Sequence, residues 1–514
     1  MCPAEPLVID DDSEEAAMDI DGGGGAPAPR KLFGLTLVHN YVALGYPIGD
    51  EDFVRTWLVG EDGNGGKLAK LNRIADLVDN LSDAQIKLYL LTRSVVQHVP
   101  YLARLIPRTQ LEPLLTAFDS RVRRSLANIA GRTGITDDAW RQAKLPYKFG
   151  GLQLQDPVIT ADAAYLGSLS SFGSLTLEIL GLAQNQNDGI NLLRLAPEAE
   201  AIVNSYNAAS GMTYEARAFP TGRAQKDLAE PIHERESTSF INSLSEESRA
   251  RVLSSSGLIA NAIYFAVPNQ YFGTKIPSHS FEKIVQFKLG NVHSESPTCS
   301  YCGHANDANG KHQTTCQQSG LFHQRHNNVV NAFSNILHTA GIVIEHEITG
   351  LIGGNNRRPG DIVVHNFTEP GAAPFDVTVV SPTCPTNIGR SRVQGELANW
   401  ADDNKRTSYI GTKVNPLSFE SHGQPSRGSR WFMHRLADRM TEMSADLRLD
   451  ELAIMTQRLY IAQRISIALQ IGNARMLQLC GSHHAARQAD RHQPDELAPM
   501  VDLRNVERRA ILSA

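Results

Sequence analysis

The segment from Arg357 to Val380 (RRPGDIVVHNFTEPGAAPFDVTVV) combines residues that could bind a metal ion with residues typical of β-strands. Asp361 and Asp376 each stand near the start of a run rich in β-branched residues. Two carboxylates in a partly buried site stay ionised together only when a cation compensates them, and oxygen ligands suit Mg²⁺. We therefore predict that Asp361 and Asp376 bind one Mg²⁺ ion, which would polarise a phosphodiester and activate water.

Paired strands must position these two aspartates close to each other. Three strand-like runs could form such pairs: 341–351, 361–366 and 375–380. A hairpin centred on 368–369 would place Asp361 and Asp376 opposite each other. A turn centred on 370–371 would instead set Asp376 opposite His365. The sequence is compatible with both registers. It is also compatible with a structural role in which Asp361 ends a Pro-Gly turn and Asp376 caps a strand.

Alternation along the strands would sort these side chains onto two faces. One face would carry the polar set together with one valine: Asp361, Val363, His365, Asp376 and Thr378. The other face would pack the hydrophobic set: Ile362, Val364, Val377 and Val379. Such a sheet would have one catalytic face and one core face.

The next helical segment, SRVQGELANWADDNKRTSYIG, places Lys405 and Tyr409 one turn apart. Lys405 could reach the ion and stabilise the negative charge that develops on the phosphorus centre. Its ordinary alternative is a solvated lysine. We predict that Lys405 acts as the charge stabiliser and that Tyr409 contacts nucleic acid.

Residues ahead of the first aspartate could complete the site. Glu347, or Glu345 as the alternative, could add a ligand or a base. Arg357 and Arg358 are placed to hold backbone phosphates, although a solvated loop would have the same composition. We predict an auxiliary role for Glu347 and nucleic-acid binding for the two arginines.

The stretch CSYCGHANDANGKHQTTC has the ligand spacing of a structural zinc site, C-x2-C-x9-H-x3-C. The predicted ligands are Cys299, Cys302, His312 and Cys316. Rival histidines stand nearby: His304, His323 and His326. A closed Cys3His shell leaves no position for water, so we expect it to hold shape rather than to catalyse. The alternative is a set of reduced thiols without metal.

Composition limits the class of protein. The chain has 514 residues, of which 41% are hydrophobic and 20% charged, which is enough for several domains with their own cores. The whole chain has a formal net charge of -6. Residues 1–30 hold eight acidic side chains and one arginine, so the rest of the chain is near neutral. No apolar run approaches the roughly 20 residues that span a bilayer. We expect an intracellular protein that does not act at a membrane.

Periodicity divides the chain into five parts. We predict a disordered acidic tail over 1–30, a mainly α-helical region over 31–280, and a zinc knuckle with a helix over 281–340. An α/β domain with a helical tail follows over 341–485, and a C-terminal tail covers 486–514. Within the helical region, a loop is expected near 214–236. The fold class is therefore α+β with several domains.

The order of these features resembles the restriction-like endonuclease of site-specific non-LTR retrotransposons, a variant PD-(D/E)XK nuclease. The matching pieces are the zinc knuckle, HQRHN, EHE, RPGD ending at Asp361, DVTVVSP from Asp376, and Lys405 with Tyr409. FESHGQPSRGSRWFMHRLADRM and RISIALQIGNARML resemble the helical tail of such polyproteins. LGYPIGDEDFV and LPYKFGGLQLQDP resemble the segment that follows a reverse-transcriptase palm or thumb.

The resemblance implies Mg²⁺-dependent cleavage of target DNA in the nucleus, with element RNA as a further partner and without a polymerase core in this chain. Two departures affect the site. Gly360 separates Pro359 from the first aspartate, and Thr378 occupies the usual in-strand lysine position. The retrotransposon variant places its lysine on the following helix, which is the role given to Lys405. The alternative function is a catalytically degenerate remnant that only binds nucleic acid.

Overall fold

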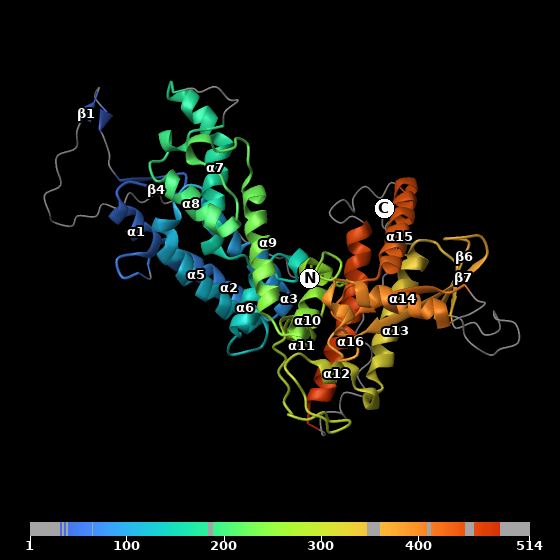
Figure 1. Ribbon diagram of the computed structural model, residues 1–514. Coiled ribbons are helices and arrows are strands. Elements are labelled where there is room, and N and C mark those ends of the chain that lie inside the picture. The colour runs from blue at the N-terminus through green and yellow to red at the C-terminus, as the bar shows by residue number, and fades with distance from the viewer. Residues whose placement is uncertain are drawn as a thin grey trace, which may run out of the picture.

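The computed structural model describes residues 31–32, 35–36, 40–63, 65–182, 189–346, 360–408, 413–447 and 457–483. The protein is a mixed α+β structure dominated by helices, with three small sheets in these ranges. Figure 1 shows two lobes, an N-terminal lobe coloured blue to green and a C-terminal lobe coloured yellow to red. The predicted tails 1–30 and 486–514 lie outside the described residues.

Helices build the N-terminal lobe, as the hydrophobic periodicity predicts. They are α1 (Glu51–Val59), α2 (Gly66–Asp79), α3 (Ala84–Arg93), α4 (His98–Ala103), α5 (Arg108–Ile129), α6 (Asp137–Lys144), α7 (Pro157–Ile179), α8 (Ala199–Ser210), α9 (Gln225–Ser243) and α10 (Glu246–Ser254). Two short hairpins precede them: β1 (Lys31–Leu32) with β2 (Leu35–Thr36), and β3 (Tyr41–Ala43) with β4 (Tyr46–Ile48).

Side-chain caps fix where several of these helices begin. The Asp50, Asp83 and Asp156 carboxylates accept backbone N–H groups in the first turns of α1, α3 and α7. Thr136 caps α6 in the same way. Each cap satisfies an N–H group that has no partner within its own helix.

The loop expected near 214–236 is only partly correct. The α9 helix begins at Gln225 and runs through Pro231. Its buried residues Leu228, Ile232 and Phe240 form a narrow stripe among charged residues. That stripe is too sparse for a strong helical pattern, so tertiary packing decides the helix.

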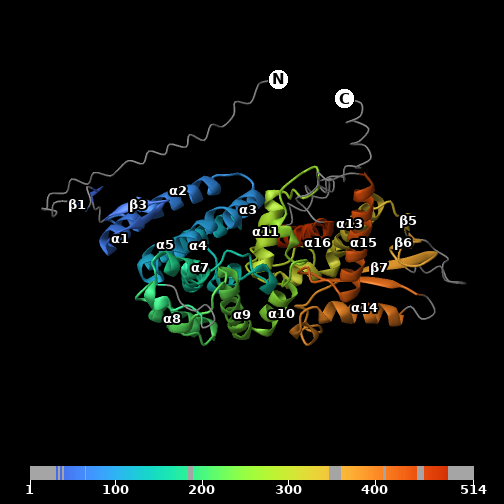
Figure 2. The same ribbon diagram turned by 90° about the horizontal axis from the view of Figure 1, so that it is seen from above.

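The C-terminal lobe combines helices with a four-stranded sheet (Figures 1 and 2). Its helices are α11 (Ser278–Leu289), α12 (Lys311–Thr315), α13 (Leu321–Thr339), α14 (Glu396–Ser408), α15 (Arg427–Leu447) and α16 (Gln457–Gly481). Its strands are β5 (Ile344–His346), β6 (Ile362–His365), β7 (Ala372–Val380) and β8 (Asn415–Glu420). The strand order is β5-β6-β7-β8, with β8 parallel to β7 and the other pairs antiparallel.

The sheet has a core face and a polar face. Ile362, Val364 and Val377 belong to the core that α13, α15 and α16 cover. The alternate residues Asp376 and Thr378 point to the opposite side, where α14 packs against β8. The alternation predicted from the sequence is therefore confirmed in the described strands.

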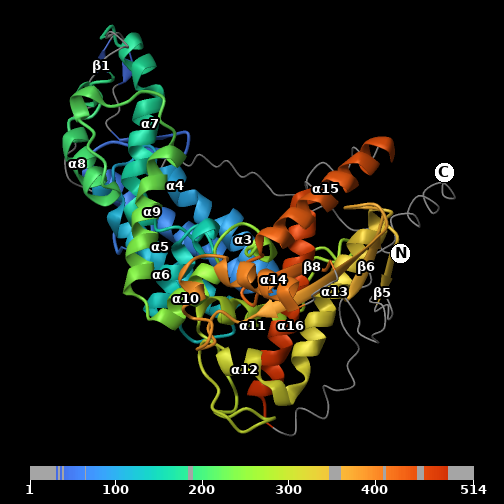
Figure 3. The ribbon, with the colours of Figure 1, turned by 45° about the vertical axis from the view of Figure 1, so that its right-hand side comes forward.

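Helix α16 ties the two lobes together. Ile467 and Ala474 belong to the large N-terminal core, whereas Ile465 and Leu469 belong to the core beneath the sheet. Figure 3 shows α16 running behind α14 toward α12 at the base of the C-terminal lobe. Displacing this helix would therefore expose apolar surface in both cores.

Candidate active site and metal centre

Strand register brings Asp361 and Asp376 together. The β6–β7 ladder pairs Ile362 with Phe375, and the Asp361 N–H donates to the Phe375 carbonyl at 2.8 Å. The two aspartates are therefore cross-strand neighbours. Of the two registers that the sequence allowed, the structure has the one centred on 368–369.

A tight connection sets this register. The Asn366 N–H donates to the Gly371 carbonyl at 2.8 Å, and the Gly371 N–H donates to the Asn366 side chain at 2.8 Å. Asn366 and Gly371 have φ values of 51° and 90°, which asparagine and glycine tolerate best. Because this turn is narrow, β7 begins at Ala372 and includes residues expected to be part of the turn.

The two carboxylates have different surroundings. The Asp361 Oδ2 accepts the Val377 N–H at 2.7 Å, and its Oδ1 lies 3.1 Å from the His326 Nε2. The Asp376 Oδ2 lies 2.7 Å from the Lys405 ammonium and forms an ion pair with it. Burial raises the pKa of the Asp376 carboxyl; Lys405 opposes this rise, and the Asp361 charge adds to it.

Helix α14 carries Lys405 to this point because buried carboxylates fasten the helix to β8. Asp402, one turn before Lys405, accepts the Ser418 N–H at 3.2 Å. Glu420 accepts the Ala398 N–H in the first turn of α14 at 3.4 Å. The lysine is thus presented by a helix that is anchored at two levels.

The burial of Glu420 has a measurable consequence. Burial raises the pKa of its carboxyl from 4.5 to about 7, so the folded protein loses stability as the pH rises between these values. We expect Glu420→Gln to be more stable than the wild type by about 3 kcal/mol at pH 8 and by about 1 kcal/mol at pH 5. Denaturant unfolding at both pH values measures this difference. A difference that does not change with pH would contradict it.

His326 completes the cluster; the sequence suggested it as a rival zinc ligand and as part of the HQRHN motif, with no role assigned beside the aspartates. It lies on α13, which packs against the core face of the sheet. His326 stands three and seven residues before Val329 and Phe333, both fully buried. This i, i+3, i+7 spacing could have placed His326 on the stripe of the helix that faces the sheet.

Four of the other predicted site residues lie outside the described residues: Glu347, Arg357, Arg358 and Tyr409. Glu345, the alternative to Glu347, has its Oε1 2.9 Å from the His365 Nε2. Its carboxylate is therefore held by the neighbouring strand. The structure brings together Asp361, Asp376, Lys405 and His326.

The predicted zinc ligands form one cluster. The ligand atoms of Cys299, Cys302, His312 and Cys316 all lie within 4.8 Å of one another. Two sulfur–sulfur distances are 3.8 Å and 3.6 Å, and the Cys302 Sγ lies 3.1 Å from the His312 Nε2. A tetrahedron with Zn–S bonds of about 2.3 Å has S···S edges of about 3.8 Å. The Cys3His cluster could therefore bind a metal ion such as zinc.

The rival histidines make other contacts. The His304 ring stacks on the His312 ring, with centroids 5.4 Å apart, and the His323 ring contacts Phe322. The cluster also packs against the end of α16, where the buried thiol of Cys480 joins the same group of side chains. The Ser300 N–H donates to the Cys480 carbonyl at 3.1 Å. A bound metal would therefore fix the C-terminal end of α16.

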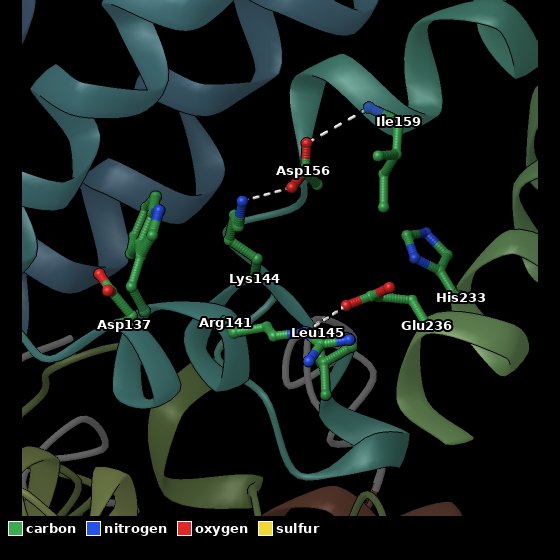
Figure 4. A pocket seen from close by; sticks show the side chains of 9 residues that line it. Asp137, Arg141, Lys144, Leu145, Asp156, Ile159, His233 and Glu236 are labelled. Atoms are coloured by element: carbon green, nitrogen blue, oxygen red, sulfur yellow. Dashed lines mark hydrogen bonds and ion pairs between the residues drawn. The ribbon is translucent and has the colours of Figure 1, made fainter. Parts of the chain in front are cut away.

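A separate pocket of about 270 Å³ lies between α6, α7 and α9 in the N-terminal lobe (Figure 4). Its wall charges are already paired, Arg141 with Glu236 at 2.6 Å and Lys144 with Asp156. Burial lowers the pKa of His233, which faces this pocket, to about 4, so the ring is neutral near pH 7. The pocket therefore presents no unpaired charge to a ligand.

Comparison with known proteins adds no family assignment: no protein-family model matches the chain, and no curated protein is significantly similar to it. Among the helices that the structure describes, none combines the length and the apolar character needed to cross a bilayer.

Proposed function

We propose that this protein is a retrotransposon-derived DNA endonuclease that uses Mg²⁺ to hydrolyse phosphodiester bonds. The observation that carries the proposal is the position of Asp361, just before β6, beside Asp376 on the neighbouring strand β7, with the Lys405 ammonium 2.7 Å from Asp376. Two carboxylates can hold a divalent ion that activates water, and an amine beside them can stabilise the charge that develops on the phosphate.

The donor set fits Mg²⁺. Asp361 and Asp376 offer carboxylate oxygens, and Asp376 is only 10% exposed, so an added cation would favour its ionised form. When bound, the ion would supply charge neutralisation and a lowered pKa for water. Lys405 would stabilise the charge that develops on the phosphate, and the His326 imidazole would orient Asp361.

The remaining roles rest on the resemblance to retrotransposon endonucleases. Glu347 would assist as a further ligand or base, and Arg357, Arg358 and Tyr409 would hold the nucleic acid. The Cys3His cluster would be a structural zinc knuckle beside a restriction-like fold. DNA would be the target, element RNA a further partner, and the nucleus the place of action.

A binding-only remnant is the second candidate, and one observation favours it. Lys405 pairs with Asp376 and His326 contacts Asp361, so each carboxylate of the cluster already has a partner within the protein. An ion-pair network of this kind could hold the sheet to α13 and α14 in a protein that no longer cleaves DNA.

The decisive experiment separates these functions. Purified full-length protein is incubated with supercoiled plasmid, with and without Mg²⁺, beside an Asp361→Asn variant. The nuclease proposal predicts nicked circles only with wild-type protein and Mg²⁺. Retention of plasmid at low salt without nicking would support the binding-only function and refute the nuclease.

A further inference from the structure

Helix α15 presents a basic, solvent-exposed face. The exposed residues of this face recur at helical spacing: Arg427, Arg430, Trp431, His434, Arg435 and Arg439. Positions three and four apart lie on the same side of a helix, so these residues form one stripe. Over twelve residues the stripe is about 18 Å long.

The opposite face of α15 is fully committed to the core. Phe432, Met433 and Leu436 are at most 2% exposed and pack beneath the sheet. The helix therefore has no apolar face with which to enter a lipid surface. A binding function of α15 must use its charged stripe.

Among the residues that the structure describes, few carboxylates compensate the positive charge on the stripe. Within the described part of the chain, no carboxylate forms an ion pair with Arg427, Arg430 or Arg435. Arg439 makes one 3.5 Å contact with Glu442. Burial lowers the pKa of His434, the charges of Arg458 and Arg430 lower it further, and the charge of Asp438 opposes this shift.

An exposed tryptophan interrupts this charge. Trp431 is 53% exposed, which is unusual for so large an apolar side chain. Arginines that flank an exposed aromatic ring match a strand whose phosphates are anionic and whose unpaired bases can stack.

The stripe begins beside the candidate active site. The Arg427 N–H donates to the Asn399 side chain on α14 at 2.9 Å, and α14 also carries Lys405. The ring of Phe432, on the buried face of α15, has its centroid 4.3 Å from that of Phe375, so α15 packs on the core face of the strand that carries Asp376. Figures 1 and 2 show α15 rising beside the sheet that carries the aspartates.

We propose that the exposed face of α15 binds single-stranded nucleic acid, with the arginines on phosphates and Trp431 stacked on an unpaired base. The inference rests on the proposed action on nucleic acid and deepens it. A strand separated from its complement at the cleavage site would leave the sheet along this helix. The face would thus hold one strand on a helix whose start contacts α14, the helix that carries Lys405.

Binding of a fluorescently labelled 20-nucleotide oligo-dT is measured by anisotropy without added Mg²⁺, so the result does not depend on cleavage. For single strands the salt slope is about 0.7 per phosphate contact, so Arg430→Ala/Arg435→Ala should reduce it by about 1.4. Trp431→Ala should weaken binding roughly 5- to 150-fold, whereas Trp431→Phe should retain most of it.

Matched control variants remove arginines and an aromatic ring from exposed positions on other helices. Arg73→Ala/Arg124→Ala removes two exposed arginines from α2 and α5, and Phe172→Ala removes an aromatic ring that is 65% exposed on α7. These variants should bind the strand like the wild type. The substituted positions are all exposed, so circular-dichroism melting should be unchanged.

An affinity of Trp431→Ala equal to that of the wild type would overturn the proposal, as would an unchanged salt slope of the double arginine variant. A different ligand of this face, the acidic segment 1–30 of the same chain, would give a different result. If a peptide of residues 1–30 lost affinity for the arginine variant while the strand did not, the acidic segment would be the ligand and the proposal would fail. If the variants change strand binding as expected but the wild-type protein does not nick plasmid, only the nuclease proposal is refuted.

Discussion

Lys405→Met is expected to lower the rate of Mg²⁺-dependent plasmid nicking by about 100- to 1,000-fold, the usual cost of removing a group that stabilises transition-state charge. The Lys405 ammonium lies 2.7 Å from the Asp376 carboxylate. Helix α14 thus brings a cation to the two aspartates of the candidate site. Methionine keeps the length of the side chain and removes its charge. Single-turnover nicking rates at saturating protein measure the effect.

The ion pair of Asp376 and Lys405 predicts that replacing either partner alone affects the free energy of unfolding differently. Burial raises the pKa of Asp376 even with Lys405 present, so its charge is costly in the folded state. Asp376→Asn should therefore leave the free energy of unfolding unchanged or slightly higher at pH 7 while it abolishes nicking. Lys405→Met should destabilise the fold by about 1–3 kcal/mol, because a buried carboxylate loses its cation.

The double variant Asp376→Asn/Lys405→Met completes the cycle. Its stability should return toward that of the wild type, and its nicking rate should be no lower than that of the worse single variant, because the two groups act together. Lys413→Met is the matched control, since Lys413 is 73% exposed and pairs with Glu369 at the surface. Additive losses of rate, or a loss in the Lys413 variant, would contradict a shared site.

Local patterns were sufficient to predict the central part of the site. Period-two alternation identified both strands, and helical spacing identified α14 with Lys405 on it. The register was left open because the length of the connection alone does not fix the turn. Asn366 and Gly371 decide it through positive φ values, which local sequence suggests only weakly.

Residues that act through tertiary packing were missed. Strand β8 pairs in parallel with β7 after a long crossover that contains α14, and no short-range signal marks such a partner. His326 reaches Asp361 only because α13 covers the core face of the sheet. Asp402 resembles a surface residue in ADDNK but is 2% exposed, since it holds the Ser418 backbone. These residues depend on how elements pack, which periodicity does not specify.

The largest expected effect on stability comes from the metal centre. Cys316→Ser should reduce bound zinc from one ion per chain toward none and lower the free energy of unfolding by several kcal/mol, a fraction of the roughly 10–16 kcal/mol with which structural zinc binds small domains. The loss should extend beyond the knuckle. Ser300 and Asn306 contact the end of α16, and α16 contributes to both main cores. Metal analysis and denaturant unfolding measure the two effects.

Two cysteines outside the predicted ligand set supply the controls. Cys480 is fully buried in the same group of side chains, and Cys384 is half-buried elsewhere. Cys480→Ser tests local packing without removing a ligand, so it should retain the metal, and Cys384→Ser should resemble the wild type in every measurement. Cobalt substitution gives the sharpest readout, because a tetrahedral thiolate site has strong visible absorption. The proposed ligand set would be refuted if Cys480→Ser lost this absorption while Cys316→Ser retained it, because the Cys480 thiol would then bind the ion in place of Cys316.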